Sequence, residues 1–380
     1  MASGRPADRA PSVKDVAALA GVSVGTVSNV INSRGTVRSA VRERVEAAIK
    51  DLGYVPNPTA QALRKGVSPL VGVAVFDLTN PFFMEAAAGI EQRLSEVGCI
   101  MSLASTHSDP SREAELLRAL AGQSVRGILL TPADSDLTVV EEIVARGTPV
   151  VLFDSPGTSA GISSVSIDDR AGAARAIEHL LSLGHHSILF LNGPATYRQA
   201  RNRARGVEDA IARRSSRDAH HDDPTAIAIE LREVDSFTAD AGRRAMLEFL
   251  AEAGVAAYTG SQGIDRSTGP LSPPDLPRGF PTAVFCANDL IAFGAMTAMR
   301  DSGVRVPHDV SIVGFDDIGI ASEMSTPLTT VHQPMTELGT EAVDLLLRLS
   351  ADPTATAHMV FSPTLVVRAS TSPPSRRPVD

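Results

Sequence analysis

The chain has 380 residues, of which 43% are apolar, and its formal net charge is −9. This length suits two or three domains, and the apolar content is ordinary for a globular protein. No apolar run approaches the roughly 18 residues that a membrane-spanning helix needs, and the first 12 residues hold no apolar segment of the kind found in secretory signals. We therefore expect a cytoplasmic protein that does not enter a membrane.

The charge is divided unevenly along the chain. Residues 1–66 hold ten Lys or Arg and five Asp or Glu, so the remainder carries a net charge of −14. A basic first segment on an acidic body indicates that only this segment meets a polyanion, because the body would repel one. Ordinary solvated surface charge produces the same asymmetry, so the pattern supports a nucleic-acid partner without establishing one.

Residues 13–32, VKDVAALAGVSVGTVSNVIN, predict two short helices joined by a tight turn. Apolar residues recur at helical spacing on both sides of Gly21, which permits the turn, and Ser23 is placed to cap the second helix. A third helix is expected over about 39–52, ending at Gly53. This order is typical of a helix-turn-helix, which places one helix in the DNA major groove, although an ordinary helical hairpin has the same spacing.

The segment after the third helix predicts a hinge. Pro56 and Pro58 prevent the helix from continuing, and TAQALRK forms barely two turns. A helix this short is unstable in isolation. We therefore expect a hinge that becomes ordered only when something packs on it.

The first 66 residues resemble those of the lac repressor family of bacterial transcriptional regulators. VKDVAALAGVSVGTVSNVIN and RERVEAAIKDLGYVPNPTAQALRKG carry the resemblance, in the order and spacing of the family. It implies a disordered N-terminus over 1–11, a helix-turn-helix DNA-binding domain over 12–55, and a hinge helix with linker over 56–68. Arg38 stands where the family usually has a small capping residue, so the third helix is expected either to begin at Ser39 or to be slightly less stable.

The DNA-contacting positions of the family correspond to Val24, Gly25, Thr26, Ser28, Asn29, Asn32, Asn57, Ala60 and Leu63. Thr26, Ser28 and Asn32 resemble the positions that contact the DNA backbone or pack the helix. Chemically, Asn29 suits adenine and Val24 suits a thymine methyl group, whereas Gly25 offers no side chain. In the hinge, Asn57, Ala60 and Leu63 match positions that enter the minor groove. Leu63 is then an apolar wedge between base steps, unless it only packs against its own chain.

Beyond Gly66, predicted strands and helices alternate. Strands are expected near 71–76, 99–104, 126–132, 149–154, 187–193, 226–234, 282–289 and 311–317, with helices between them. This number of strands is too large for one small sheet. We therefore expect an α/β domain of two lobes, each a parallel sheet with helices on both faces.

The family resemblance extends over about 70–370, through phrases such as FDLTNPFFMEAAAGIE, VFCANDLIAFGAM and PLTTVHQP. It implies a periplasmic-binding-protein-like domain over 69–370 for effector binding and dimerisation. The residues that follow, TSPPSRRPVD at 371–380, predict a disordered tail. Three crossings, near 164–168, 330 and 360, divide this domain into lobe 1 (about 69–165 and 331–360) and lobe 2 (about 166–330 and 361–370). Helix pairing through residues 82–97 is the expected contact of a homodimer.

Open parallel sheets bind ligands at the carboxyl ends of their strands, so cleft residues should follow each strand directly. This places residues 80–83, Asp154, 197–203, Asn288 and Asp316 in the cleft. The resemblance implies effector contacts at Phe82, Asp154, Arg203, Asn288 and Asp316, with Tyr197 and Gln199 at positions where effector identity varies. Such side chains suit a small polyhydroxylated or heterocyclic molecule. Helix capping is an alternative role for Asn288 and Asp316, and core packing for Phe83.

Several segments and residues are expected to have no catalytic or metal-binding role. The Gly, Ser and Pro-rich residues 256–281 and the polar residues 213–224 should be surface loops. The His-His-Asp-Asp run at 220–223 suits an exposed charged loop better than a metal site. Cys99 and Cys286 lack metal-site spacing and should be buried free thiols. We expect no metal and no cofactor.

The sequence holds no GxSxG elbow, Walker loop or HExxH motif, so no catalytic residues are expected. It predicts a homodimeric repressor that binds a pseudo-palindromic double-stranded DNA operator and is controlled by a small-molecule effector, a sugar or related metabolite. One alternative is an enzyme acting on a sugar-like ligand with an appended DNA-binding head. Another is a free-standing solute-binding protein, which would need an export signal and would lack the basic head.

Overall fold

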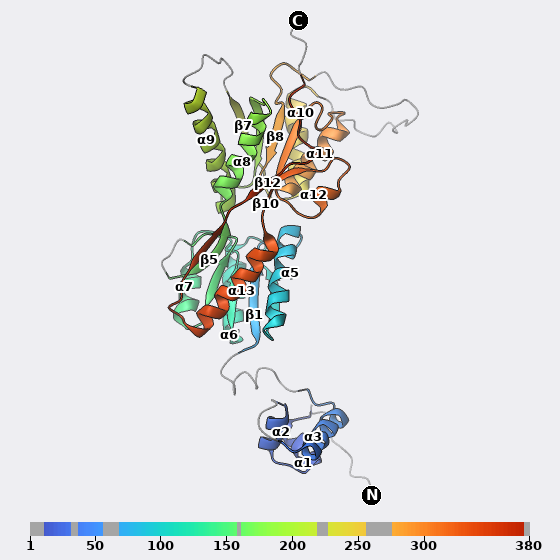
Figure 1. Cartoon of the computed structure of the whole chain (residues 1–380), viewed down its shortest axis with the longest axis vertical. Coiled ribbons are helices and arrows are strands. Elements are labelled where there is room, and N and C mark those ends of the chain that lie inside the picture. Colours follow the sequence, from blue (N-terminus) through green and yellow to red (C-terminus); the bar gives the residue numbers. More distant parts are fainter. Residues whose placement is uncertain are drawn as a thin grey trace, which may run out of the picture. The chain divides into compact units, whose positions relative to one another are not determined.

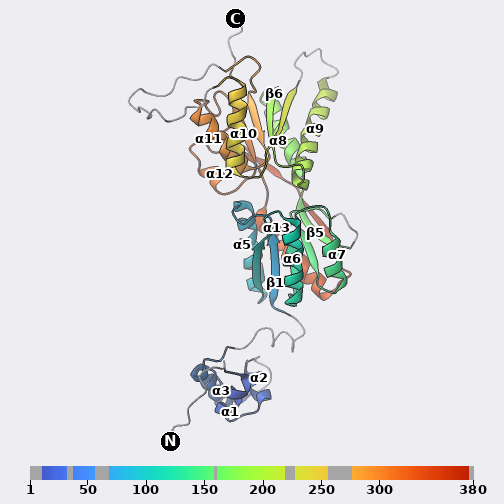
Figure 2. The ribbon, with the colours of Figure 1, turned by 180° about the vertical axis from the view of Figure 1, so that it is seen from behind.

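The computed structural model describes residues 11–31, 37–55, 68–157, 161–218, 227–255 and 276–375. The chain forms two compact units, Met1–Pro69 and Leu70–Asp380. Figures 1 and 2 show the helical first unit and the two lobes of the second. Within the described ranges, every helix is too short or too polar to traverse a bilayer.

The first unit is built from α1 (Val13–Ala20), α2 (Val24–Ile31) and α3 (Ser39–Leu52). Their apolar faces meet in one core, where Val16, Val27 and Val45 are completely buried. Gly21 and Gly53 end α1 and α3 at φ values of 63° and 60°. Only glycine takes this left-handed conformation without steric cost, so the two predicted helix ends are confirmed.

The helix starts also agree with the sequence. The Ser23 hydroxyl accepts a hydrogen bond from the Thr26 N–H at 3.1 Å, which confirms Ser23 as the cap of α2. α3 begins at Ser39, and Arg38 before it makes no side-chain capping bond. The predicted DNA-contacting residues that lie outside the described ranges are Asn32, Asn57, Ala60 and Leu63.

Among its described residues, the second unit contains two six-stranded sheets. In the first sheet, all neighbours are parallel in the order β11 (His358–Phe361), β5 (Ser163–Ile167), β4 (Val150–Phe153), β3 (Gly127–Leu130), β1 (Leu70–Val75) and β2 (Ile100–Ser105). The second has the order β12 (Thr364–Val366), β10 (Thr329–His332), β9 (Ser311–Asp316), β8 (Ala283–Cys286), β6 (Ser187–Asn192) and β7 (Ala228–Glu233). There β12 runs antiparallel to β10 and the other neighbours are parallel. The two predicted parallel sheets are confirmed, apart from this edge strand.

Helices cover both faces of each sheet (Figures 1 and 2). The first sheet and the helices on it form lobe 1. α5 (Pro81–Glu96) and α13 (Met335–Ala351) pack on one face of this sheet, and α6 (Pro110–Gly122) and α7 (Thr138–Ala145) pack on the other. The second, lobe 2, carries α8 (Asp169–Ser182), α9 (Arg198–Asp218), α10 (Ala239–Glu252), α11 (Asp289–Asp301) and α12 (Ile320–Glu323). Val73 and Val75 of β1 face α5 and α13, whereas Ala74 faces α6, as the two-residue repeat of a strand requires.

Within the part of the second unit that the structure describes, the chain passes between the lobes three times, after Ile167, after His332 and after Phe361. These positions lie close to the three crossings expected from the sequence. Each lobe is therefore assembled from separate stretches of the chain. A change in the angle between the lobes must act on all three crossings together.

Two predictions about loops need correction. α9 continues to Asp218, so residues 213–218 of the polar stretch are helical. The predicted disordered tail began at residue 371, but Thr371 and Ser372 hydrogen-bond to the rings of His179 and His185. The hydroxyl of Thr371 and the carbonyl oxygen of Ser372 thereby hold the chain against lobe 2 beyond the last strand.

Other predictions for the loops fall partly outside the described ranges. Residues 219–224 and 256–275 lie there, as does the His-His-Asp-Asp run at 220–223. The two cysteines, Cys99 and Cys286, are buried and free, as predicted.

Gly89→Ala is expected to destabilise lobe 1. α5 approaches α13 so closely that a Cβ atom at residue 89 would lie 2.5 Å from the carbonyl oxygen of Thr336. Overpacking of this kind costs about 1–3 kcal/mol, which urea denaturation measures. Gly122→Ala in α6 is the matched control, because its Cβ would meet nothing within 4 Å. Equal effects of the two substitutions would contradict the close helix contact.

Candidate functional site

One face of α2 fits the predicted DNA-reading surface. Val27 and Val30 point into the three-helix core, whereas Val24, Gly25 and Asn29 lie on the exposed side of the helix. Thr26 and Ser28, also predicted to serve DNA binding, are half-buried. The helix thus has the orientation that a recognition helix needs, with its predicted base-reading positions free of the core.

The second unit holds a cavity between its lobes, at the carboxyl ends of strands from both sheets. Its empty volume is about 680 Å³, including the part open to solvent. This is within the range of roughly 300–1,000 Å³ found for small-molecule sites. It is lined by Phe76, Asp77, Asn80, Phe82, Phe83, Ser108, Asp154, Tyr197, Gln199, Arg203, Ser236, Phe237, Thr238, Asn288, Asp316 and Gln333. All seven predicted effector-contacting residues therefore lie around one cavity.

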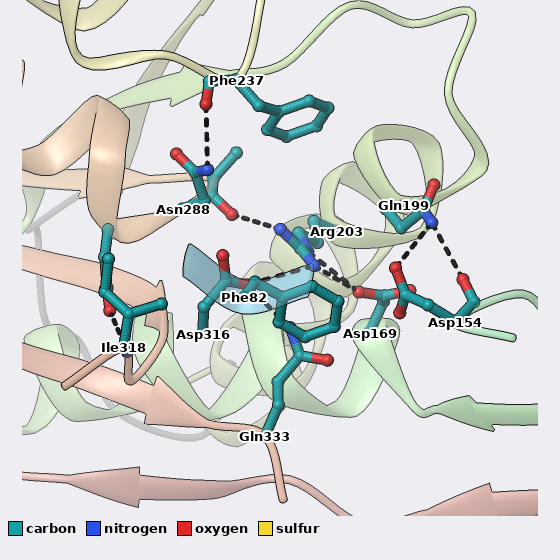
Figure 3. A network of polar contacts seen from close by, with 12 residues as sticks. Phe82, Asp154, Asp169, Gln199, Arg203, Phe237, Asn288, Asp316, Ile318 and Gln333 are labelled. Atoms are coloured by element: carbon teal, nitrogen blue, oxygen red, sulfur yellow. Dashed lines mark hydrogen bonds and ion pairs between the residues drawn. The ribbon is translucent and has the colours of Figure 1, made fainter. Parts of the chain in front are cut away.

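Arg203 of α9 lies at the centre of the polar network in this cavity (Figure 3). Its side chain is 4% exposed, and its Nε and Nη2 both lie 2.9 Å from Oδ1 of Asp169. Its Nη1 donates to the carbonyl oxygen of Ala287, and its Nη2 lies 3.8 Å from Oδ1 of Asp316. The guanidinium carbon also lies 3.8 Å from the centre of the Phe315 ring. The protein itself therefore fixes the position of this guanidinium.

Asp169 is a site residue that sequence reasoning missed. It is the first residue of α8, directly after the first crossing, and its carboxylate is the main partner of Arg203. The preceding strand β5 reads SSVSI and is only five residues long. Because that strand is rich in Ser, its carboxyl end was not recognised as a position in the cleft. The need of a buried arginine for an anionic partner was the one available signal.

Three buried carboxyl groups surround the single guanidinium: Asp154, Asp169 and Asp316 (Figure 3). Burial raises the pKa of all three, and of Asp154 and Asp316 well above the ordinary value, while Arg203 opposes the rise. If all were ionised, three carboxylates and one guanidinium would leave a net charge of −2. The cluster therefore keeps a proton to a higher pH than exposed carboxylates do.

Asp154 and Asp316 also have unusual backbone conformations. Asp154 follows β4 at a φ of 52°, and Asp316 ends β9 at a φ of 112°. Residues with a Cβ rarely adopt such angles, although Asp tolerates the left-handed region better than most. Strained backbone of this kind persists where the surrounding structure holds it, and it concentrates at functional sites.

The structure decides between the alternative roles of two cleft residues. Asn288 caps α11, because its Oδ1 accepts a hydrogen bond from the N–H of Ile291 at 2.9 Å, and it lines the cavity as well. Asp316 caps no helix, so that alternative is wrong. Its Oδ1 accepts a hydrogen bond from Nε2 of Gln333 at 2.7 Å.

Two glutamines connect elements across the cleft. Gln199 in lobe 2 donates from Nε2 to the carbonyl oxygen and to Oδ2 of Asp154 in lobe 1, at 2.9 and 3.0 Å. Gln333 follows β10 on the second crossing, and its Oε1 is buried without a hydrogen-bond partner among the described residues. A buried acceptor at a cavity wall can accept a hydrogen bond from water or from a donor on a bound molecule. Gln333 was missed because β10 was not predicted as a strand.

A run of aromatic rings forms the apolar wall of the cavity and passes from lobe 1 to lobe 2. In order, the rings belong to Phe82, Phe83, Phe76, Tyr197 and Phe237. Neighbouring ring centres lie 5.0, 5.7, 5.3 and 5.6 Å apart. Phe82 and Phe83 also belong to the core of lobe 1. Phe83 therefore packs in the core, as the alternative stated, and also lines the cavity.

Asp289 supports the loop that follows Asp316. It is fully buried; its Oδ2 accepts a hydrogen bond from the N–H of Ile318 at 3.0 Å, and its Oδ1 accepts one from the hydroxyl of Thr330 at 2.5 Å. This carboxyl group thus ties α11, the loop after β9 and strand β10 together. Burial raises its pKa to about 7. Among the described residues, no group of three or more His, Cys, Asp or Glu is arranged to hold a metal ion.

Three family models match the chain. The model of bacterial regulatory proteins of the lacI family matches residues 12–57. The model of periplasmic binding proteins and the sugar binding domain of the LacI family matches residues 68–223, and a periplasmic binding protein-like domain matches residues 177–371. Together the matches cover both units.

The chain is also similar to whole curated proteins. It is 32% identical to the HTH-type transcriptional regulator DegA of Bacillus subtilis (strain 168) over 366 residues, 95% of this chain and 98% of that protein. It is 32% identical to the ribose operon repressor of Escherichia coli (strain K12) over 362 residues, 94% of this chain and 99% of that protein.

Solved structures share the fold. The lac repressor dimer bound to operator and the anti-inducer ONPF matches with a TM-score of 0.78 and 30% identity, covering 96% of this chain and 100% of that one. A LacI family transcriptional regulator from Enterococcus faecium with bound ribose matches with a TM-score of 0.65 and 25% identity, covering 80% of this chain and 99% of that one.

Asp289→Asn is expected to change how stability depends on pH. The folded-state pKa of about 7 lies above the ordinary value of 3.8, so the native state holds this proton more tightly than the unfolded state does. The resulting stabilisation is present below about pH 4 and is lost as the pH rises to about 7. Asparagine does not titrate. The free energy of unfolding of the wild type minus that of the variant should therefore fall by up to about 4 kcal/mol over this range.

Urea denaturation at a series of pH values measures this difference. The comparison cancels the other titrating groups, which both proteins share. A difference that stays constant from pH 4 to pH 7 would contradict the raised pKa of Asp289.

Proposed function

Since the chain belongs to the lacI family of bacterial regulatory proteins, we propose that it is a repressor whose affinity for operator DNA is controlled by a small molecule bound between the lobes. Family membership makes it a DNA-binding transcriptional regulator. The observation that carries effector control is the cavity itself, which gathers all seven predicted effector residues from both lobes.

On the DNA side, α2 enters the major groove in this proposal. Asn29 pairs with an adenine, Val24 contacts a thymine methyl group, and Gly25 allows close approach. Support comes from the exposure of these three positions on a helix whose other face is buried. The remaining proposed contacts are Thr26, Ser28 and Asn32 beside the groove, with Asn57, Ala60 and Leu63 in the minor groove.

The assembly we propose is a homodimer on a pseudo-palindromic operator. The lac repressor, to which the chain is similar over 96% of its length, is a dimer bound to operator in its solved structure. Two heads on one dimer read two half-sites, which explains why such operators are palindromic. α5, with residues 82–97 expected at the contact, supplies helix pairing between the protomers.

A sugar is the effector class that the relatives favour. The regulator from Enterococcus faecium holds ribose, and a relative with 32% identity is named for the ribose operon. Aromatic walls, a fixed guanidinium and several carboxyl groups suit the apolar faces and hydroxyl groups of a monosaccharide. We therefore propose D-ribose as the first probe.

Control requires that the effector bind two arrangements of the lobes unequally. The lining of the cavity supports this part of the proposal, because Asp154 is contributed by lobe 1, whereas Arg203, Asn288 and Asp316 are contributed by lobe 2. A molecule that contacts both sets favours the arrangement that brings them together. The three crossings carry that change through the second unit.

Catalysis is no part of this proposal, since the relatives are transcriptional regulators and the sequence holds no recognised catalytic motif. An operator-binding protein of a bacterium acts where the chromosome is, so we place it in the cytoplasm. Turnover of a bound sugar by the purified protein would favour the alternative, an enzyme with an appended DNA-binding head.

Arg203→Ala is expected to abolish the effect of D-ribose on operator affinity while leaving sugar-free operator binding in place. The substitution removes the fixed guanidinium from the cavity and leaves Asp169 without its partner. Fluorescence anisotropy of a labelled operator, with and without sugar, measures the response. Arg205→Ala, on the exposed side of the same helix, is the matched control and should respond normally.

Loss of a buried partner also costs about 3–5 kcal/mol, so folding must be checked by circular dichroism. Arg203→Lys keeps the charge but lacks the planar fork, and it should respond weakly. A full response to sugar in a folded Arg203→Ala protein would contradict the assigned site.

Asn29→Ala is expected to weaken binding to the operator without weakening binding to random DNA. A bidentate pair with adenine contributes about 1–3 kcal/mol of discrimination, or roughly five- to 150-fold in affinity. Competition between a duplex selected from a random pool and bulk DNA measures the ratio. An equal loss on both kinds of DNA would show that Asn29 contacts no base.

A further inference from the structure

A group of paired charges in lobe 2 lies next to the cavity without lining it. Asp317 follows Asp316 directly, and its Oδ1 accepts a hydrogen bond from Nη2 of Arg368 at 2.6 Å. Its Oδ2 lies 2.9 Å from Nδ1 of His332, which donates to the carboxylate when it carries the proton. We call Asp317, His332 and Arg368 the Asp317 cluster. None of the three is among the described residues that line the cavity.

The two partners of Asp317 belong to strands that lead to crossings between the lobes. His332 is the last residue of β10, directly before the second crossing, and Arg368 follows β12, which the chain enters from the third. β10 and β12 pair with each other near the junction of the lobes (Figure 1). Arg368 is also bonded to the start of β10, through its N–H to Oγ1 of Thr329 and through Nη1 to the carbonyl oxygen of Leu328. One carboxylate therefore joins the loop after β9 to both strands.

The same two segments form a second pair, which does line the cavity. Gln333 directly follows His332, and its Nε2 donates to Oδ1 of Asp316 at 2.7 Å. Asp316 and Asp317 both have positive φ values, 112° and 60°. Backbone of this kind persists only where the surrounding contacts hold it, and the bonds of Asp317 to His332 and Arg368 are such contacts. Adjacent residues on two segments thus serve the cavity and the crossings.

Partial burial makes the Asp317 cluster stronger than an ordinary surface ion pair. The side chains of Asp317 and Arg368 are only 12% and 19% exposed, and their hydrogen bond joins two charged groups. Charge-assisted hydrogen bonds are roughly twice as strong as neutral ones, and burial reduces their screening by solvent. The cluster can therefore keep the two strands and the loop together as one unit.

We infer that Asp317 is a positioning residue, which holds Asp316 and Gln333 in place for the effector and makes the second and third crossings move together. This inference rests on the proposed function, because it concerns how the same cavity acts on the crossings. A ligand that displaces Asp316 or Gln333 also displaces the next residue on the same backbone. That displacement reaches both crossing strands through the carboxylate of Asp317.

Asp309 provides a matched control for Asp317. Its carboxylate accepts two hydrogen bonds from the guanidinium of Arg305, both at 2.8 Å, and its side chain is 15% exposed. It lies just before β9, at the end of that strand away from Asp316. Asp309→Asn therefore removes an ion pair of similar burial from lobe 2 without touching a crossing strand.

Amide hydrogen exchange of the full chain, measured by mass spectrometry without ligand, tests the inference. Asparagine tolerates a positive φ as aspartate does, so Asp317→Asn removes the charge without straining the backbone. Exchange in residues 332–338 and 361–366 should accelerate about tenfold, because local opening becomes easier. The first of these ranges enters α13 in lobe 1, which a contact acting only within lobe 2 would not affect. Asp309→Asn should accelerate exchange only near residues 305–310.

Two variants of His332 test the hydrogen bond separately. The side chain of His332 is 41% exposed, so its replacement leaves no buried cavity and the protein should fold. His332→Ala should accelerate exchange in the same two ranges about fivefold. His332→Asn places an amide N–H where Nδ1 stands and should restore the wild-type rate. Equal rates in His332→Ala and His332→Asn would contradict the role of this hydrogen bond.

Calorimetry with D-ribose as the probe gives a second measurement. Asp317→Asn should weaken sugar binding about fivefold, although residue 317 does not line the cavity, and Asp309→Asn should leave it unchanged.

The exchange comparison decides the inference whether or not D-ribose binds, because it uses no ligand. Acceleration in Asp317→Asn that is confined to residues 316–319, or that Asp309→Asn reproduces at the crossings, would overturn it. The proposed function fails separately, and only if the full chain shows no preference for any duplex over random competitor.

Discussion

The buried ion pair between Arg203 and Asp169 is the constraint on which the cleft depends. Asp169 begins α8 directly after the first crossing, and Arg203 lies in α9, so the pair joins two helices of lobe 2 beneath the cavity. Buried charges of this kind are stable only when paired and hydrogen-bonded. The pair positions a fixed guanidinium next to Asp316, which ends β9 in a strained conformation. Asp289 holds the adjoining loop to β10, and the strain at Asp316 is thereby maintained.

The same network explains how a ligand bound in the cavity can change contacts outside the cavity. Gln199 joins α9 to Asp154 in lobe 1, and Gln333 joins the second crossing to Asp316 in lobe 2. After that crossing the chain enters α13, which packs closely on α5 in lobe 1. A ligand that competes for the carboxyl groups of Asp154 or Asp316 must therefore alter contacts that hold the lobes and a crossing in place. In our proposal, effector control arises from this change in contacts between the lobes. Coupling requires that the ligand bind two arrangements of the lobes with unequal affinity.

Much of the fold and of the cavity was predictable because local rules and global structure agree. Gly21 and Gly53 end helices at positive φ, Ser23 caps α2, and apolar strands are followed by polar residues that meet at one edge of each sheet. Asp169 and Gln333 were missed because they follow the short strands SSVSI and TTVH, whose Ser and Thr residues hide the apolar pattern of a buried strand. Helical residues 213–218 and the attachment of Ser372 to His185 depend on packing partners far away in the sequence. The raised pKa values of Asp154 and Asp316 likewise arise only when separate segments bury them together.

The central claim is that one small-molecule cavity and one DNA-binding head are thermodynamically coupled. Coupling of binding free energies is reciprocal, so the factor by which a sugar changes operator affinity must equal the factor by which operator changes sugar affinity. Calorimetric titration of the sugar into free protein and into the protein–operator complex measures the second factor directly. The account predicts two sugar affinities that differ, in a ratio that matches the change in operator affinity. Identical sugar affinities with and without bound operator would contradict it.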